Sequence, residues 1–173
     1  MAVQKFLGMV SGKLQQIVAI ATSAGTSDAG KIIAAGTDGK LHTSFLPTGI
    51  GANTVVATAS EAIAAGKLVN LFVDGAATKL RLADNSNGRT AWGYLKESVT
   101  ANATATAYRL NTVMPGQSSL TPGAEYWLGT AGGVTPTPLD AADDANAGKL
   151  SQFIGQAISA TEIATVEYLP VEL

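Results

Sequence analysis

A glycine-rich segment near the N-terminus contains the residue types that bind nucleotide phosphates. Residues 25–31 (GTSDAGK) match the pattern G-x-x-x-x-G-K and follow the apolar run 17–21. In such a loop, backbone amides hold the phosphates, the lysine reaches the outer phosphates and the next Ser or Thr binds magnesium. Here Ile32 takes the place of that Ser or Thr, and Gly36 interrupts the helix that should follow. The sequence therefore favours a Gly-rich turn, with nucleotide hydrolysis as an alternative.

Two further groups of polar residues have types that occur in active sites or metal sites. His42 lies near Asp38 and Ser44 in sequence, but the chain has no G-x-S-x-G motif, the turn that exposes a nucleophilic serine. The three aspartates within 140–144 lack the central Gly and closing Glu of a calcium loop. We expect a loop histidine and a solvated acidic turn, with a loose cation site at a subunit contact as the alternative. No catalytic residue, metal or cofactor is predicted.

The chain has two tryptophans, Trp92 and Trp127, with Tyr94 and Tyr126 close by in sequence. Aromatics make up only 6% of the residues, so the core or a subunit interface is expected to use these rings first. An exposed tryptophan is also the platform on which sugar rings stack in carbohydrate-binding proteins. Core packing is therefore the leading interpretation, and a glycan platform is the alternative.

The composition excludes several classes of protein. No cysteine is present, which rules out disulfides and zinc–thiolate sites. The net charge of −2 and the lack of a basic run argue against a nucleic-acid partner, and no apolar run is long enough to cross a membrane. Charged residues are 14% of the chain, against roughly 25% in average globular proteins. With 30 Ala, 19 Gly and 19 Thr among 173 residues, large core side chains are scarce.

Short β-branched or alternating runs between dense turn residues predict an all-β fold, a compact β-barrel or sandwich with very little helix. One or two helical turns are expected in 60–65, and a helical turn or loop in 141–147. A composition shift near residues 47–51 predicts an extended N-terminal arm or hairpin region over 1–50 and a main β domain over 51–173. The predicted strands are 3–9, 14–20, 31–35, 54–58, 68–73, 78–83, 91–97, 103–110, 125–128, 153–158 and 163–169.

The order of several segments resembles that of tailed-bacteriophage virion proteins of the head decoration, or capsid cement, kind. The segments are 23–33, 39–41, 44–51, 59–70 and 153–163. The resemblance implies a non-enzymatic, β-rich protein that binds the outside of the capsid, commonly as a homotrimer, and reinforces the head. It implies the major capsid protein as partner, a place on the outer capsid surface and synthesis in the host cytoplasm. No nucleic acid or membrane is expected.

The N-terminal arm is the segment that we expect to dock on such a partner. A flat apolar strand is an aggregation hazard when it is left free, so it should be covered on the trimer or on the capsid. The predicted contact residues are Phe6, Leu7 and Met9 in the arm and the loop residues Phe45, Leu46 and Pro47. The alternative is a tail-fibre or baseplate-associated protein that contacts host surface glycan through Trp92 or Trp127.

Overall fold

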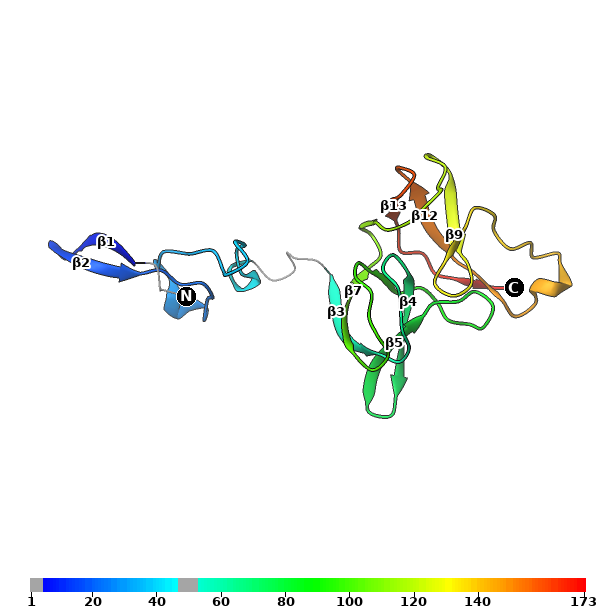
Figure 1. Ribbon diagram of the computed structural model, residues 1–173, viewed down its shortest axis with the longest axis horizontal. Coiled ribbons are helices and arrows are strands. Elements are labelled where there is room, and N and C mark those ends of the chain that lie inside the picture. Colours follow the sequence, from blue (N-terminus) through cyan, green and yellow to red (C-terminus); the bar gives the residue numbers. More distant parts are fainter. Residues whose placement is uncertain (1–4, 47–52) are drawn as a thin grey trace. The chain divides into compact units, whose positions relative to one another are not determined.

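A computed structural model describes residues 5–46 and 53–173 of the chain, which is all-β apart from short turns of 3-10 helix (Figure 1). It divides into two compact units, Met1–Gly51 and Ala52–Leu173. The described elements of the first unit are two strands and two 3-10 helices: β1 (Lys5–Val10), β2 (Lys13–Val18), η1 (Thr26–Asp28) and η2 (Thr43–Phe45).

Strands β1 and β2 form an antiparallel hairpin joined by the two-residue turn Ser11–Gly12. Both turn residues have positive φ, 51° for Ser11 and 77° for Gly12. A type I′ turn requires this at its two central positions, and its twist matches that of the strands that it joins. The turn places Val10 opposite Lys13 and so fixes the register of the whole hairpin.

The second unit begins with a closed five-stranded barrel in the order β3-β5-β4-β6-β7. Strand β3 closes it by pairing antiparallel with β7 and, over two residues, parallel with β5. Its interior is small, and three alanines help to fill it: Ala57, Ala59 and Ala107. The barrel strands are β3 (Thr54–Ala59), β4 (Leu68–Asp74), β5 (Ala77–Leu82), β6 (Gly93–Leu95) and β7 (Thr104–Arg109).

A five-stranded antiparallel sheet in the order β10-β9-β12-β13-β8 follows the barrel. Its two edge strands are only two residues long, which limits pairing with other chains. A separate short pair, β11 (Leu150–Ser151) with β14 (Val171–Glu172), and the 3-10 helix η3 (Asp144–Asn146) complete the unit. The sheet strands are β8 (Val113–Met114), β9 (Glu125–Leu128), β10 (Val134–Thr135), β12 (Phe153–Ala157) and β13 (Ile163–Thr165).

One hydrophobic core joins the barrel to the sheet. Leu68 and Tyr94 on the barrel strands pack in the same cluster as Met114, Leu128 and Ile154 of the sheet, and all five are at most 1% exposed. Tyr94 donates its hydroxyl hydrogen to the carbonyl of Val113, 2.7 Å away, so its burial leaves no polar atom unpaired. The barrel and the sheet therefore form a single body with continuous packing.

Two buried amide side chains also link parts of this body. Gln152 pairs with both backbone groups of Ala91: it accepts from the amide at 2.7 Å and donates to the carbonyl at 2.9 Å. Asn85 donates its side-chain amide to the carbonyl of Leu128 at 2.9 Å. Each side chain supplies hydrogen bonds that a regular strand pair would otherwise provide.

Four predicted elements differ from the structure. No strand forms over 31–35, because Ile33 makes only a single bridge, to Ile20, and has no sheet to join. No helix forms over 60–65, because Ile63 is extended, pairs with Val99 and buries its side chain in the barrel. The strands predicted over 91–97 and 163–169 are shortened to β6 and β13.

Replacing Gln152 with Met tests the amide link. Met fills a similar volume but leaves the buried amide and carbonyl of Ala91 without partners, and each unpaired group costs about 1–3 kcal/mol. We expect the free energy of unfolding in urea to fall by about 2–4 kcal/mol on the same basis. Gln156→Met, on β12, is the control: the hydrogen bond that Gln156 donates to the Gly123 carbonyl, 2.8 Å away, is exposed, so water can replace it and stability should change little. Equal losses in the two variants would show that the link is unimportant.

Candidate functional site

One face of the N-terminal hairpin is an exposed apolar surface. The register places Leu7 opposite Gln16 and Met9 opposite Leu14, with Val18 on the same side of the hairpin. The side chains are largely free of contacts: Leu7 is 73% exposed, Met9 69% and Leu14 66%. The alternation of β1 and β2 therefore gathers apolar residues on a face that no described residue covers.

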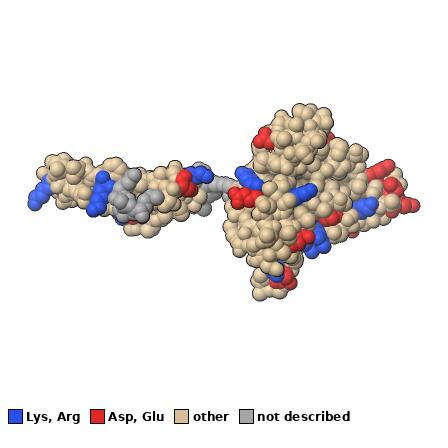
Figure 2. Space-filling model, in the orientation of Figure 1, with Lys and Arg blue, Asp and Glu red and all other residues tan. Residues whose placement is uncertain are grey.

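The opposite face of the hairpin is apolar as well. Phe6 lies opposite Ile17, and Val10 lies on the same side; Phe6 is 42% and Val10 40% exposed. Among residues 5–46, Ala19 is the sole buried apolar side chain. Figure 2 shows that most of this unit's surface carries no charge. A lone two-stranded hairpin is marginally stable in water, and the described residues of this unit bury only one apolar side chain to support it.

The predicted contact residues occupy two separate segments of this unit. Phe6, Leu7 and Met9 all lie on β1, with Phe6 on the face opposite to the other two. Phe45 ends the 3-10 helix η2 and is half-buried, Leu46 is 37% exposed, and Pro47 lies outside the described residues.

Sequence reasoning missed the contribution of β2. Leu14 and Val18 complete the apolar face that Leu7 and Met9 begin. The Ser11–Gly12 turn in the sequence could have predicted this face, because a two-residue turn fixes which residues of the two strands lie opposite each other.

The Gly25–Lys31 segment folds without the geometry of a phosphate-binding loop. It forms the three-residue 3-10 helix η1, and no α-helix follows Lys31 within the described residues. The Lys31 ammonium lies 2.6 Å from Asp28, which also accepts a hydrogen bond from the amide of Ala24. The hydrogen bonds from Ala24 and Lys31 hold the pKa of Asp28 below its ordinary value. The lysine that would reach a phosphate is therefore already paired.

His42 acts as the cap of a short helix. Its Nδ1 atom accepts from the backbone amide of Ser44 at 3.1 Å and lies 2.9 Å from the Ser44 hydroxyl. The Ser44 hydroxyl in turn accepts from the amide of Ser23, and Asp38 binds the amide of Lys40. Asp38 makes no contact that would orient His42, so these side chains do not form the relay of a hydrolytic triad.

The acidic residues of 140–144 bind their own backbone. Asp140 accepts from the amide of Ala142 and Asp143 from that of Ala145, both at the start of tight turns. Over residues 5–46 and 53–173, no three Asp, Glu or His side chains gather in a way that could hold a metal ion. No helix in the described parts of the chain is long and apolar enough to cross a membrane.

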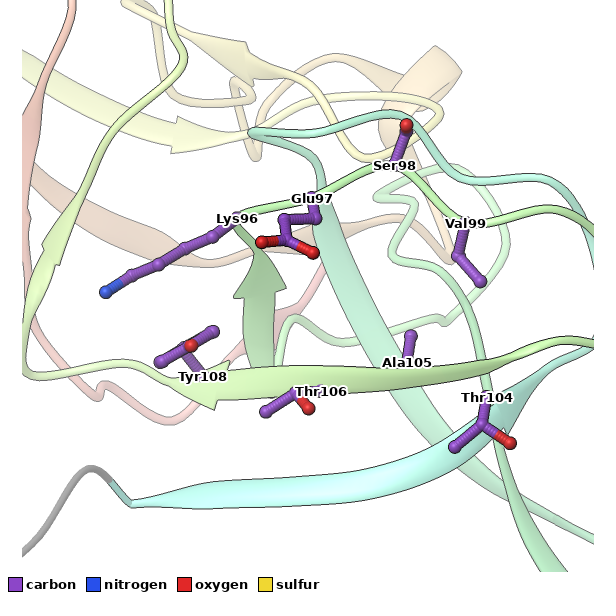
Figure 3. A pocket seen from close by; sticks show the side chains of 8 residues that line it. All are labelled: Lys96, Glu97, Ser98, Val99, Thr104, Ala105, Thr106 and Tyr108. Atoms are coloured by element: carbon purple, nitrogen blue, oxygen red, sulfur yellow. The ribbon is translucent and has the colours of Figure 1, made fainter. Parts of the chain in front are cut away.

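A shallow polar pocket of about 260 Å³ lies between β7 and the segment that follows β6 (Figure 3). The Lys96 ammonium sits 4.1 Å from the centre of the Tyr108 ring. The other lining residues are Glu97, Ser98, Val99, Thr104, Ala105 and Thr106. None of the hydrogen bonds found in the described residues joins two of these polar side chains. The pocket thus offers polar contacts to a small ligand, without the nucleophile–base pair of covalent catalysis.

The two tryptophans lie in different surroundings. Trp92 packs against the cluster inside the barrel. Trp127 is half-buried beside Phe153, its partner across strands β9 and β12, with ring centres 5.5 Å apart. Tyr168 is 61% exposed and meets Phe153 edge-on at 5.7 Å. Trp127, Phe153 and Tyr168 form a row of three rings, called the aromatic row below, that neither core cluster contains.

An ion pair holds the segment that carries Tyr168. Arg109 donates two hydrogen bonds to the Glu167 carboxylate, from Nε at 2.9 Å and from Nη2 at 2.5 Å. These hydrogen bonds hold the pKa of Glu167 below its ordinary value and raise that of Arg109. The Glu167 amide also donates to the Asn111 side chain. The end of β7 thereby fixes the backbone next to the aromatic row.

No family model and no curated protein matches the chain. Among solved structures it is similar to the head fiber gp8.5 N base of bacteriophage phi29, with 14% sequence identity and a TM-score of 0.41. The similarity covers 66% of this chain and 98% of that one.

Glu167→Gln tests the ion pair. Because the folded-state pKa of Glu167 is lowered, the pair stabilises the segment at pH values above the carboxylate's unfolded pKa. This contribution is lost as the pH falls through the folded-state value. We expect faster amide exchange over 166–169 in Glu167→Gln at neutral pH, and no such change in the control Glu125→Gln. In the wild type, protection corrected for intrinsic exchange should decrease on acidification; identical exchange in all three proteins would contradict the assignment.

Proposed function

We propose that this chain is a virion structural protein that binds the outer surface of a phage capsid and stabilises the head. Its N-terminal unit docks on the major capsid protein, and the unit Ala52–Leu173 stays folded outside it. The chain acts in this role without catalysis. The sequence resemblance to head decoration proteins supports this proposal, and the apolar N-terminal hairpin is the structural observation that carries it.

The hairpin supports docking because it lacks what an independent fold needs. Apolar side chains cover both faces, and one buried alanine is no substitute for a core. Both six-residue strands also have an outer edge with no described strand beside it, which can pair with a strand of a partner. Burial of its faces on another protein would remove this apolar surface from water.

The charge of the hairpin indicates the kind of surface that receives it. Lys5 and Lys13 are its charged residues, and no Asp or Glu occurs over 5–27. An apolar groove with an acidic rim on the capsid is complementary to this pattern. Many copies on one shell, commonly as homotrimers in the proteins that this sequence resembles, would add their modest individual contacts through effective concentration.

Leu7→Ser/Met9→Ser tests the docking surface. Burial of the two side chains contributes about 3 kcal/mol or more, so the double variant should bind about a hundredfold more weakly. The measurement is co-sedimentation of the purified chain with capsids, lacking this protein, of the virus that encodes it. Melting of the unit Ala52–Leu173 should not change, because no residue of its core is altered.

Gln16→Ser is the matched control. Gln16 lies directly opposite Leu7 on the same face, and its replacement alters the hairpin without removing an apolar side chain. It should bind capsids as the wild type does. Undiminished binding by the double variant, or by a chain that lacks residues 2–10, would refute docking through the hairpin.

The aromatic row favours a second function, contact with host surface glycan. Glu125 and Gln156 are cross-strand partners in the same sheet, and both are exposed. Planar polar side chains beside aromatic rings can hydrogen-bond sugar hydroxyls while the rings contact the sugar's C–H face. This candidate places the binding site on Trp127, Phe153 and Tyr168.

Two single-tryptophan variants test the glycan candidate. Trp92→Phe leaves Trp127 as the fluorescent reporter, and Trp127→Phe leaves Trp92. Addition of host surface polysaccharide should shift the emission of the first variant and leave that of the second unchanged, because Trp127 belongs to the aromatic row, whereas Trp92 is half-buried against the barrel cluster. If the polysaccharide changes the emission of neither variant, the glycan candidate is refuted, and the proposal of capsid docking is not affected.

A further inference from the structure

The loop between Asp84 and Arg89 contains an Asn–Gly pair, Asn87–Gly88, and no other asparagine in the sequence is followed by glycine. Asp84 and Arg89 pair across the base of the loop, where the carbonyl of Asp84 accepts a hydrogen bond from the backbone amide of Arg89 at 3.2 Å. Residues 86–88 at the tip are exposed. The reactive dipeptide therefore lies in water at the end of a short, closed loop.

The local geometry leaves both reacting groups accessible. Neither the Asn87 side chain nor the Gly88 amide takes part in any hydrogen bond found in the described residues. Gly88 has a φ of 74°, and a Cβ built on it would meet no atom within 4 Å. Without a side chain, the Gly88 nitrogen is unshielded and its backbone can reach conformations closed to other residues.

We propose that Asn87 is a site of spontaneous deamidation, with water as the co-reactant. The Gly88 backbone nitrogen loses its proton to solvent and attacks Cγ of Asn87. The new C–N bond closes a five-membered succinimide, and the side-chain nitrogen leaves as ammonia. Water then breaks one of the two ring C–N bonds, giving aspartate or isoaspartate. No electron is transferred, and one neutral amide becomes one carboxylate.

The reaction is favoured because the attacking nitrogen belongs to the residue next to Asn87. Nitrogen and carbonyl carbon belong to adjacent residues, so ring closure is intramolecular and avoids the entropy cost of bringing two molecules together. Asn102 provides a contrast in the same chain: it is exposed with a φ of 63°, but Ala103 follows it and carries a Cβ beside the attacking nitrogen. Asn85 is buried and hydrogen-bonded, which protects its amide.

The base of the loop is anchored, so the change should stay local. Asp84 accepts from the amide and hydroxyl of Ser86 and from the amide of Ala131. The backbone carbonyl of Asn85 accepts a hydrogen bond from the amide of Leu150, and the backbone amide of Asn85 donates one to the carbonyl of Gly129. Conversion changes the formal charge of the chain from −2 to −3 and adds a carboxylate near Arg89 while the core contacts persist.

The test is incubation of the purified full chain in mildly alkaline buffer at physiological temperature. Isoelectric focusing should show a new form shifted by one negative charge that co-migrates with Asn87→Asp. Peptide mass spectrometry should place aspartate and isoaspartate at residue 87 and leave Asn102 intact. Asn87→Ser, which has no amide to lose, is the matched control and should keep a single form.

Each outcome decides the proposal. Conversion at residue 87 in the wild type, absent from Asn87→Ser, supports it. An acidic form that persists in Asn87→Ser assigns the reaction to another residue and overturns it. A wild type that stays unconverted while a synthetic peptide of residues 83–91 converts shows that the fold protects Asn87, and this also overturns it.

Discussion

The scarcity of large apolar side chains is the constraint on which the rest of this structure depends. The chain places nearly all of those that it buries, among them Leu68, Tyr94 and Ile154, in one body formed by the barrel and the sheet. The described part of the N-terminal unit has only Ala19 as a buried apolar residue. One unit can thus be stabilised by its own core, whereas the described residues of the other form almost none.

Small residues also determine how the barrel is built. Alanines at 57, 59 and 107 leave room for five strands to close around few large side chains, chiefly Ile63, Leu80 and Leu95. The core between barrel and sheet uses the larger residues. Where strand pairing stops, the side chains of Gln152 and Asn85 supply the missing hydrogen bonds. Packing and polar satisfaction therefore reinforce each other at the same junction.

The sequence predicted the elements in which local pattern and packing agree. Alternation and turn residues located β3, β4, β5 and β7 to within about one residue at each end, because each has a neighbour along most of its length. The two-residue strands β8, β10, β11 and β14 carry no pattern of their own and exist through their partners. At Ile63 the local pattern misled the prediction. The helix cap at Ser60 predicted a helical turn, but Ile63 is extended, because its side chain is buried in the barrel and its backbone pairs with Val99. The exposed apolar residues of β1 were recognised, but the face that they share with Leu14 and Val18 needed the register.

The pairing of β3 with β7 governs when this protein can fold during its synthesis. The first barrel strand pairs with β7, the last of the five, which ends at Arg109, so the whole barrel must leave the ribosome before it can close. The N-terminal hairpin emerges well before that and has local pairing alone to hold it. A newly made chain therefore exposes the apolar side chains of the hairpin before the barrel can close, and many copies made at once would depend on chaperones or prompt assembly to stay apart.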